Sequence, residues 1–220
     1  MLNKIRLILI LLVLSSVLYA GDFSMNLAMG YRDSITTNAP IVLSFTADVD
    51  DFLISTQIQP KELSAGFGYD LRVGKTISNI FYLHTLYVPE EGGFSDLSYI
   101  FKQRFSWEYF AIGYGIGVQG GVSYSPYATT PLWSLSPLVL LGVDFKFNPV
   151  VLSFSLSLNN RLERSWKAVP IYDASIEFLL DEHSSVVISG FLRQAEYLMD
   201  QWHMMTAWGV SLGYVYRRNM

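Results

Sequence analysis

Apolar and polar residues alternate with a period of two along most of the chain. The clearest stretch runs from Phe110 to Tyr124, FAIGYGIGVQGGVSY, where large apolar side chains share one face and glycines, Gln119 and Ser123 share the other. This stretch is much longer than the about 5 to 6 residues of an ordinary strand, and glycine weakens an ordinary strand interior. A tilted strand that crosses a bilayer needs about 9 to 11 residues, with its apolar face in lipid. The pattern therefore predicts a membrane-spanning strand.

The same alternation recurs along the rest of the chain and predicts a series of strands. Their ranges are 24–31, 41–49, 52–59, 63–74, 80–88, 97–107, 110–124, 135–147, 150–159, 171–180, 185–195 and 205–216. Long polar connections alternate with short turns, except that the connection near Pro60 is short. Bacterial barrels alternate long outer loops with short periplasmic turns. We therefore predict an all-β fold, a closed antiparallel up-and-down transmembrane β-barrel of 12 strands. Ten strands are the alternative if 52–59 and one neighbour are loop.

The first twenty residues have the pattern of a secretory signal peptide. Lys4 and Arg6 precede an apolar run over 7–14, and small and apolar residues end at Ala20. An uncleaved anchor is the rival interpretation, but the apolar run is short for a membrane span. We expect cleavage after Ala20 and a single barrel domain over 21–220.

Composition narrows the class of function. Removal of Lys4 and Arg6 would leave 13 basic side chains against 19 acidic ones, without a basic cluster, so we expect no nucleic-acid partner. The chain has no cysteine, which excludes disulfides and thiolate metal sites. No run of about 18 apolar residues follows residue 20, so the 51% of hydrophobic residues must be distributed among alternating strands.

These features resemble one family. The signal peptide, the glycine- and aromatic-rich stretches 63–74 and 110–124, and the closing stretch AWGVSLGYVY resemble the small outer-membrane β-barrel proteins of two-membrane bacteria. The resemblance implies an outer-membrane location, with outer-membrane lipids and the barrel-assembly machinery as partners. In that family the last strand usually ends at an aromatic residue, whereas here Arg217 to Met220 follow Tyr216. We expect a monomer without a cofactor or a metal.

Charged residues on the small-residue face are the main candidates for a functional site. They are Asp48, Asp70, Arg72, Lys102, Arg104, Asp144, Lys146 and Glu177. Each lies toward the periplasmic end of its strand if the N-terminus is periplasmic. Buried charges persist only when they are paired or hydrated. The pattern predicts a charged lumen constriction that filters solutes. The alternative is that these charges only hydrate the lumen and stabilise the barrel.

The glycines of the central stretch are the second candidate feature. Gly113, Gly115, Gly117 and Gly121 share the inward face. Because they carry no side chain, we expect them to border the lumen and to leave its closure to the charged strands opposite.

Three functions are compatible with these patterns. A narrow channel for small solutes is the main hypothesis, and a non-transporting barrel whose outer loops, especially 160–170, bind a partner or ligand is the alternative. The third is a lipid acyl hydrolase, because His183 and Ser185 have the i, i+2 spacing that places a base beside a hydroxyl on one strand face. His183 falls in a predicted periplasmic turn, so we assign no catalytic residue. No metal-binding or phosphate-binding motif is present in the sequence.

Overall fold

Twelve antiparallel strands form the described part of the chain. The computed structural model describes residues 22–33, 41–59, 62–88, 92–124, 130–159, 169–198 and 202–218. The strands are β1 (Phe23–Asp33), β2 (Ile41–Val49), β3 (Phe52–Gln59), β4 (Glu62–Val73), β5 (Ile77–Val88), β6 (Gly92–Ser106), β7 (Phe110–Tyr124), β8 (Leu132–Phe147), β9 (Val150–Asn159), β10 (Val169–Leu179), β11 (Ser184–Leu198) and β12 (Trp202–Arg218). The described residues include no helix long and apolar enough to cross a membrane.

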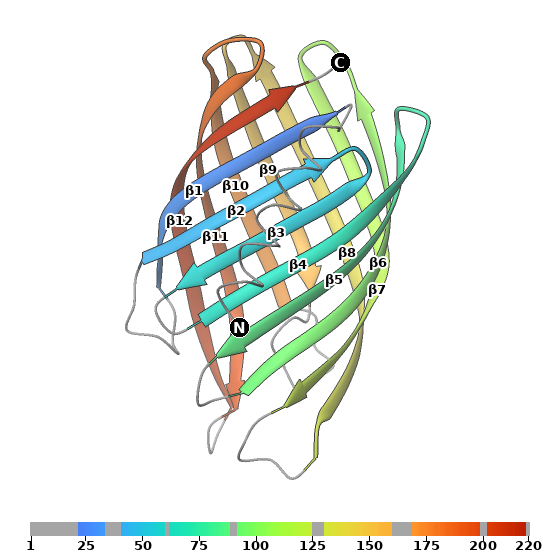
Figure 1. Ribbon diagram of the computed structural model, residues 1–220, viewed down its shortest axis with the longest axis vertical. Helices are drawn as coiled ribbons and strands as arrows, with labels where there is room; N and C mark the ends of the chain where they lie inside the picture. The colour runs from blue at the N-terminus through green and yellow to red at the C-terminus, as the bar shows by residue number, and fades with distance from the viewer. Residues whose placement is uncertain are drawn as a thin grey trace, which may run out of the picture.

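The strands close into a single barrel. Each strand pairs with its neighbours in the sequence, and β1 pairs with β12 along the whole length of β1. Figure 1 shows the strongly tilted strands, with the blue β1 beside the red β12. This closure leaves no unpaired sheet edge in the membrane. The predicted 12-strand up-and-down barrel is confirmed, and β3 is a full member, so the ten-strand alternative is wrong.

Strand bounds differ most from the prediction at β6. The sequence pattern placed 92–96 in a loop, because Gly92, Gly93 and Phe94 show no alternation. The backbone of this segment is nevertheless paired on both sides, with Tyr87 and Tyr124 both opposite Gly93. Backbone hydrogen bonding to two neighbours thus extends the strand beyond the range that side-chain polarity indicates.

The two ends of the barrel differ. Short turns at 50–51, 74–76, 107–109, 148–149 and 180–183 join strands at one end, which we call the turn end. Gly74 in one of these turns has a φ of 67°, a conformation that favours glycine. The opposite strand ends form the loop end and adjoin 34–40, 60–61, 89–91, 125–129, 160–168 and 199–201, which lie outside the described residues. The predicted signal peptide, residues 1–20, also lies outside them.

The outer surface of the barrel is apolar. Leu97, Leu27 and Ile116 are 61%, 60% and 57% exposed on the outward face, whereas the inward Gln119 is 3% exposed. Such a continuous apolar surface is stable only against lipid. Aromatic rings gather near both ends, with Tyr31 and Trp208 5.3 Å apart toward the loop end and the stacked Trp107 and Phe110 4.5 Å apart at the turn end. These clusters are typical of interfacial girdles.

Candidate channel lumen

A cavity of about 400 Å³ lies inside the barrel. Its volume is within the range of about 300–1,000 Å³ that is usual for small-molecule sites. The inward polar side chains that line it are Ser44, Gln57, Lys102, Arg104, Asp144, Ser153, Ser155, Asp173, Ser175, Ser189 and Ser211. The lining therefore combines a serine-rich wall from β9 to β12 with charged groups from β6, β8 and β10.

Two facing glycines open the wall at this cavity. Gly113 of β7 pairs directly with Gly142 of β8, and both line the cavity. These glycines belong to a row of inward residues that stand opposite one another in neighbouring strands, which we call a register row. The row runs from Arg104 of β6 through Gly113, Gly142 and Ser155 to Asp173 of β10. Between the two charged ends of this row, only one short hydroxyl side chain projects inward.

The charges of β6 and β8 meet across β7. The Arg104 Nη2 lies 2.6 Å from Asp144 Oδ2, and the Lys146 Nζ donates to Ser106 Oγ at 2.6 Å. Both interactions join strands that are not adjacent. They pass over β7 where its inward residue is small, since Ala111 stands opposite both Ser106 and Asp144 in the register. The small-residue face of β7 thus makes room for an ion pair and a hydrogen bond that lie along the wall.

The remaining predicted charges form local contacts. Arg72 Nε lies 3.3 Å from Asp70 Oδ2, which also accepts a hydrogen bond from Ser78. Asp48 accepts a hydrogen bond from Ser24 at 3.1 Å. All eight predicted charges lie in the turn half of the barrel, but their contacts are separate and local, and among the described residues Lys102 has no ion pair.

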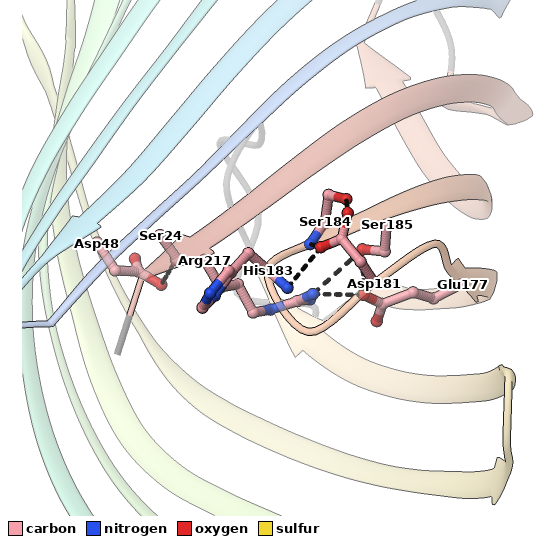
Figure 2. Close-up of polar contacts among 8 residues, drawn as sticks. All are labelled: Ser24, Asp48, Glu177, Asp181, His183, Ser184, Ser185 and Arg217. Carbon is pink, nitrogen blue, oxygen red and sulfur yellow. Dashed lines mark hydrogen bonds and ion pairs between the residues drawn. The ribbon is translucent and has the colours of Figure 1, made fainter. Parts of the chain in front are cut away.

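Arg217 is a lumen residue that the prediction missed. Its Nη1 lies 2.6 Å from Glu177 Oε1 and donates to Ser185 Oγ at 3.1 Å, while the Ser185 hydroxyl donates to Glu177 at 2.5 Å. Figure 2 shows this triad spanning β10, β11 and β12. The signal was present in the sequence, because the period of two that makes Gly213 inward also makes Arg217 inward.

Buried polar contacts occupy the middle and the loop half of the barrel on the β3 to β6 side. The Tyr82 ring lies against Gly66 and Gly68, and its hydroxyl is 2.5 Å from Ser55 Oγ. His84 Nδ1 lies 3.1 Å from Oδ2 of Asp96, which is 2% exposed. The sequence pattern does not indicate this pair, because it predicts a loop at Asp96.

The four predicted lumen glycines have different surroundings. Gly113 lines the cavity. A Cβ on Gly115 would lie 3.1 Å from Lys102 Cγ, and a Cβ on Gly121 would lie 2.6 Å from the Phe94 ring. A Cβ on Gly117 would overlap the carbonyl oxygen of Tyr99. Three of the four glycines therefore lie beneath or against atoms of β6, and they provide room for that neighbouring strand.

The serine of the hydrolase hypothesis is engaged by other groups. Ser185 is fully buried between Glu177 and Arg217, and no hydrogen bond joins it to His183 among the described residues. In the adjoining turn, hydrogen bonds from the Ser184 hydroxyl and the His183 amide hold the pKa of Asp181 below its usual value. Within the described ranges, no cluster of His, Asp and Glu could hold a metal ion. The loop 160–170 of the partner-binding hypothesis lies almost entirely outside the described residues.

Comparison with known proteins identifies the fold. No protein-family model matches the sequence, and no curated protein matches it. The barrel resembles the solved KdgM porin, described in complex with disordered oligogalacturonate, with a TM-score of 0.55, 6% identity, and coverage of 88% of this chain and 98% of that chain. It resembles the NanC porin with a TM-score of 0.57 and 9% identity, over 87% of this chain and 98% of that chain.

A third solved structure agrees with these two. The Acinetobacter baumannii outer-membrane protein Omp33 has a TM-score of 0.51 at 9% identity, over 90% of this chain and 98% of that chain. The chain therefore has the fold of the small outer-membrane β-barrel proteins. Together with its apolar outer surface, this fold is that of a bacterial outer-membrane protein.

Proposed function

We propose that the protein is a narrow outer-membrane channel for small solutes. The observation that carries this proposal is a cavity of about 400 Å³, with serines and charged side chains in its lining, inside a closed barrel whose outer face is apolar. The serines and charged side chains around this cavity provide hydrogen-bonding and charged groups along which a hydrated solute can pass. The resemblance to solved porins supports the same function.

We further propose that the charged side chains of the turn half filter solutes. Arg104 and Asp144 retain 59% and 25% side-chain exposure, and Arg72 retains 44%, so these groups face hydrated space. Charges in a narrow hydrated lumen change the local concentration of permeating ions. The predicted constriction is thus interpreted as a wall of short ion pairs that borders the solute path.

Single-channel recording in planar lipid bilayers tests the channel. The purified barrel should produce discrete conductance steps, and simultaneous replacement of Arg72, Lys102 and Arg104 by Gln should shift the reversal potential in a salt gradient toward cation preference. Lys75→Gln, in the turn between β4 and β5, is the matched control for loss of one positive charge away from the cavity. A folded barrel that gives no steps would overturn the proposal.

A further inference from the structure

Two charged groups at the cavity have no ion-pair partner in the described part of the chain. Arg104 and Asp144 neutralise each other at 2.6 Å. Lys102 lines the same cavity without an ion pair among the described residues. Asp173 also lines it, and its carboxylate accepts a hydrogen bond from Ser155, a neutral donor, at 3.4 Å. One cation and one anion therefore remain available to a solute.

These two groups come from separated parts of the wall. Lys102 is on β6 and Asp173 is on β10, with β7, β8 and β9 between them in the closed sheet. Asp173 is linked in the register through Ser155, Gly142 and Gly113 to Arg104, and Lys102 is the next inward residue of β6 from Arg104 toward the loop end. A solute in the cavity meets a positive group from one strand and a negative group from another.

The charge balance of the lining favours one kind of solute. Two cations and two anions line the cavity, and hence their formal charges cancel. A simple ion of either sign is attracted by one unpaired group and repelled by the other. A solute that carries both charges is attracted by both groups. The serines provide neutral donors and acceptors, which replace part of the hydration of such a solute.

We propose that the cavity is a passage site for small zwitterionic solutes, the class of free amino acids and short peptides. The solute carboxylate interacts with Lys102 and the solute ammonium interacts with Asp173 as the solute passes. This inference rests on the proposed channel function and deepens it. A neutral polyhydroxylated solute would use only the serines, and its passage would not depend on either charge.

Swelling of proteoliposomes tests the inference. The purified barrel is reconstituted, and rates are compared for L-glutamine and xylitol, which are similar in size but differ in that only glutamine is a zwitterion. Glutamine should enter faster than xylitol. Lys102→Gln and Asp173→Asn should each lower the glutamine rate by about two- to fivefold, the effect of one hydrated ion pair, and leave the xylitol rate unchanged.

A charge exchange distinguishes electrostatics from altered pore shape. The double variant Lys102→Glu with Asp173→Lys reverses the two charges, and a zwitterion can reverse its orientation in response. The preference of this double variant for glutamine over xylitol should therefore be greater than that of Lys102→Gln or Asp173→Asn. Lys75→Gln should behave as wild type.

The outcomes separate this inference from the channel proposal. If neither solute enters, the channel proposal fails and this inference fails with it. Equal entry of glutamine and xylitol into wild-type vesicles overturns only the zwitterion preference. Equal slowing of both solutes in Lys102→Gln and Asp173→Asn also overturns it, because the two residues would then set pore size.

Discussion

Small inward residues make room for different side chains in the turn half and in the loop half of the lumen. In the turn half, the small Ala111 of β7 stands opposite Asp144 and leaves room for the Arg104–Asp144 ion pair, which stays hydrated and lies beside the cavity. In the loop half, Gly66 leaves room for the Tyr82 ring, and Gly121 leaves room for the Phe94 ring. Small residues therefore accommodate a hydrated ion pair in one half and aromatic rings against the wall in the other.

The hydrated ion pairs of one half and the tight contacts of the other also contribute differently to the free energy of unfolding. Hydrated ion pairs such as Arg104–Asp144 contribute about 0–1 kcal/mol to folding. Overpacking of a tight contact costs about 1–3 kcal/mol, and a buried polar group without a partner costs a similar amount. We therefore expect substitutions near the middle of the barrel and in the loop half to affect unfolding, and substitutions of turn-half charges to affect permeation.

The largest expected effect distinguishes two glycines of β7. Gly117→Ala places a Cβ against the backbone carbonyl of Tyr99, which no side-chain rotation relieves, and should cost about 1–3 kcal/mol of unfolding free energy. Gly113→Ala is the matched control, because its Cβ would first meet the carbonyl oxygen of Gln103 at 3.4 Å. Urea unfolding in lipid vesicles, followed by tryptophan fluorescence, measures both. Equal losses for the two variants would contradict the difference in packing.

The second prediction concerns the buried pair of the loop half. His84→Leu removes the hydrogen-bond partner of Asp96 Oδ2 in a site where Asp96 is 2% exposed, and should cost about 1–3 kcal/mol of unfolding free energy. The double variant His84→Leu with Asp96→Leu should lose less than His84→Leu alone, because no polar group is then left unpartnered. If the double variant unfolds more readily than His84→Leu, the pair is not the source of the effect. The same unfolding measurement applies.

The sequence predicted the fold well because one physical rule governs every strand. Lipid on the outside forces apolar residues to alternate with small or polar ones, and this rule located β2, β3, β7 and β9 at their observed bounds. It was weaker where the inward face is itself bulky. Phe94 is the clearest case, since an inward aromatic removes the alternation at the start of β6.

The candidate site was predictable in part, for a related reason. Parity alone places Arg104 and Asp144 inside the barrel, but it does not show that the ion pair crosses β7. That contact depends on the register of three strands and on a small residue in the middle one. Likewise, the pairing of Gly113 with Gly142 depends on register, which the sequence pattern of a single strand does not contain.

The third prediction extends the comparison to the closing strand. Arg217→Gln removes the ion pair with Glu177, whose side chain is 18% exposed, and leaves Ser185 with one partner fewer. We expect a loss of about 1 kcal/mol, because this pair is less hydrated than Arg104–Asp144. The resistance of the folded barrel to heating in detergent, read as a gel-mobility shift, provides the measurement, and Arg104→Gln is the comparison. A larger effect from Arg104→Gln would reverse the expected order.

The smallest expected effect lies in the turn beside this triad, and it depends on pH. The Ser184 hydroxyl donates to Asp181 at 2.5 Å and the His183 amide donates at 2.7 Å, so the pKa of Asp181 is lower in the folded barrel than its usual value of 3.8. A carboxylate whose pKa is lowered by folding stabilises the fold above the unfolded-state pKa, and this contribution disappears as the pH falls through the folded-state pKa. Asp181→Asn should therefore lower the urea midpoint slightly at pH 7, and the difference from wild type should shrink below about pH 4.

Glu182→Gln, one residue further along the same turn, is the matched control for that pH dependence. It removes a carboxylate from the same exposed turn and leaves the Asp181 hydrogen bonds in place. We expect its urea midpoint to follow wild type across the pH range. If Asp181→Asn and Glu182→Gln show the same pH dependence, then general loss of negative charge at the turn end explains the effect, and the hydrogen bonds of Asp181 do not. A pH-dependent difference confined to Asp181→Asn would instead assign the turn's stability to those local bonds, independent of the lumen charges.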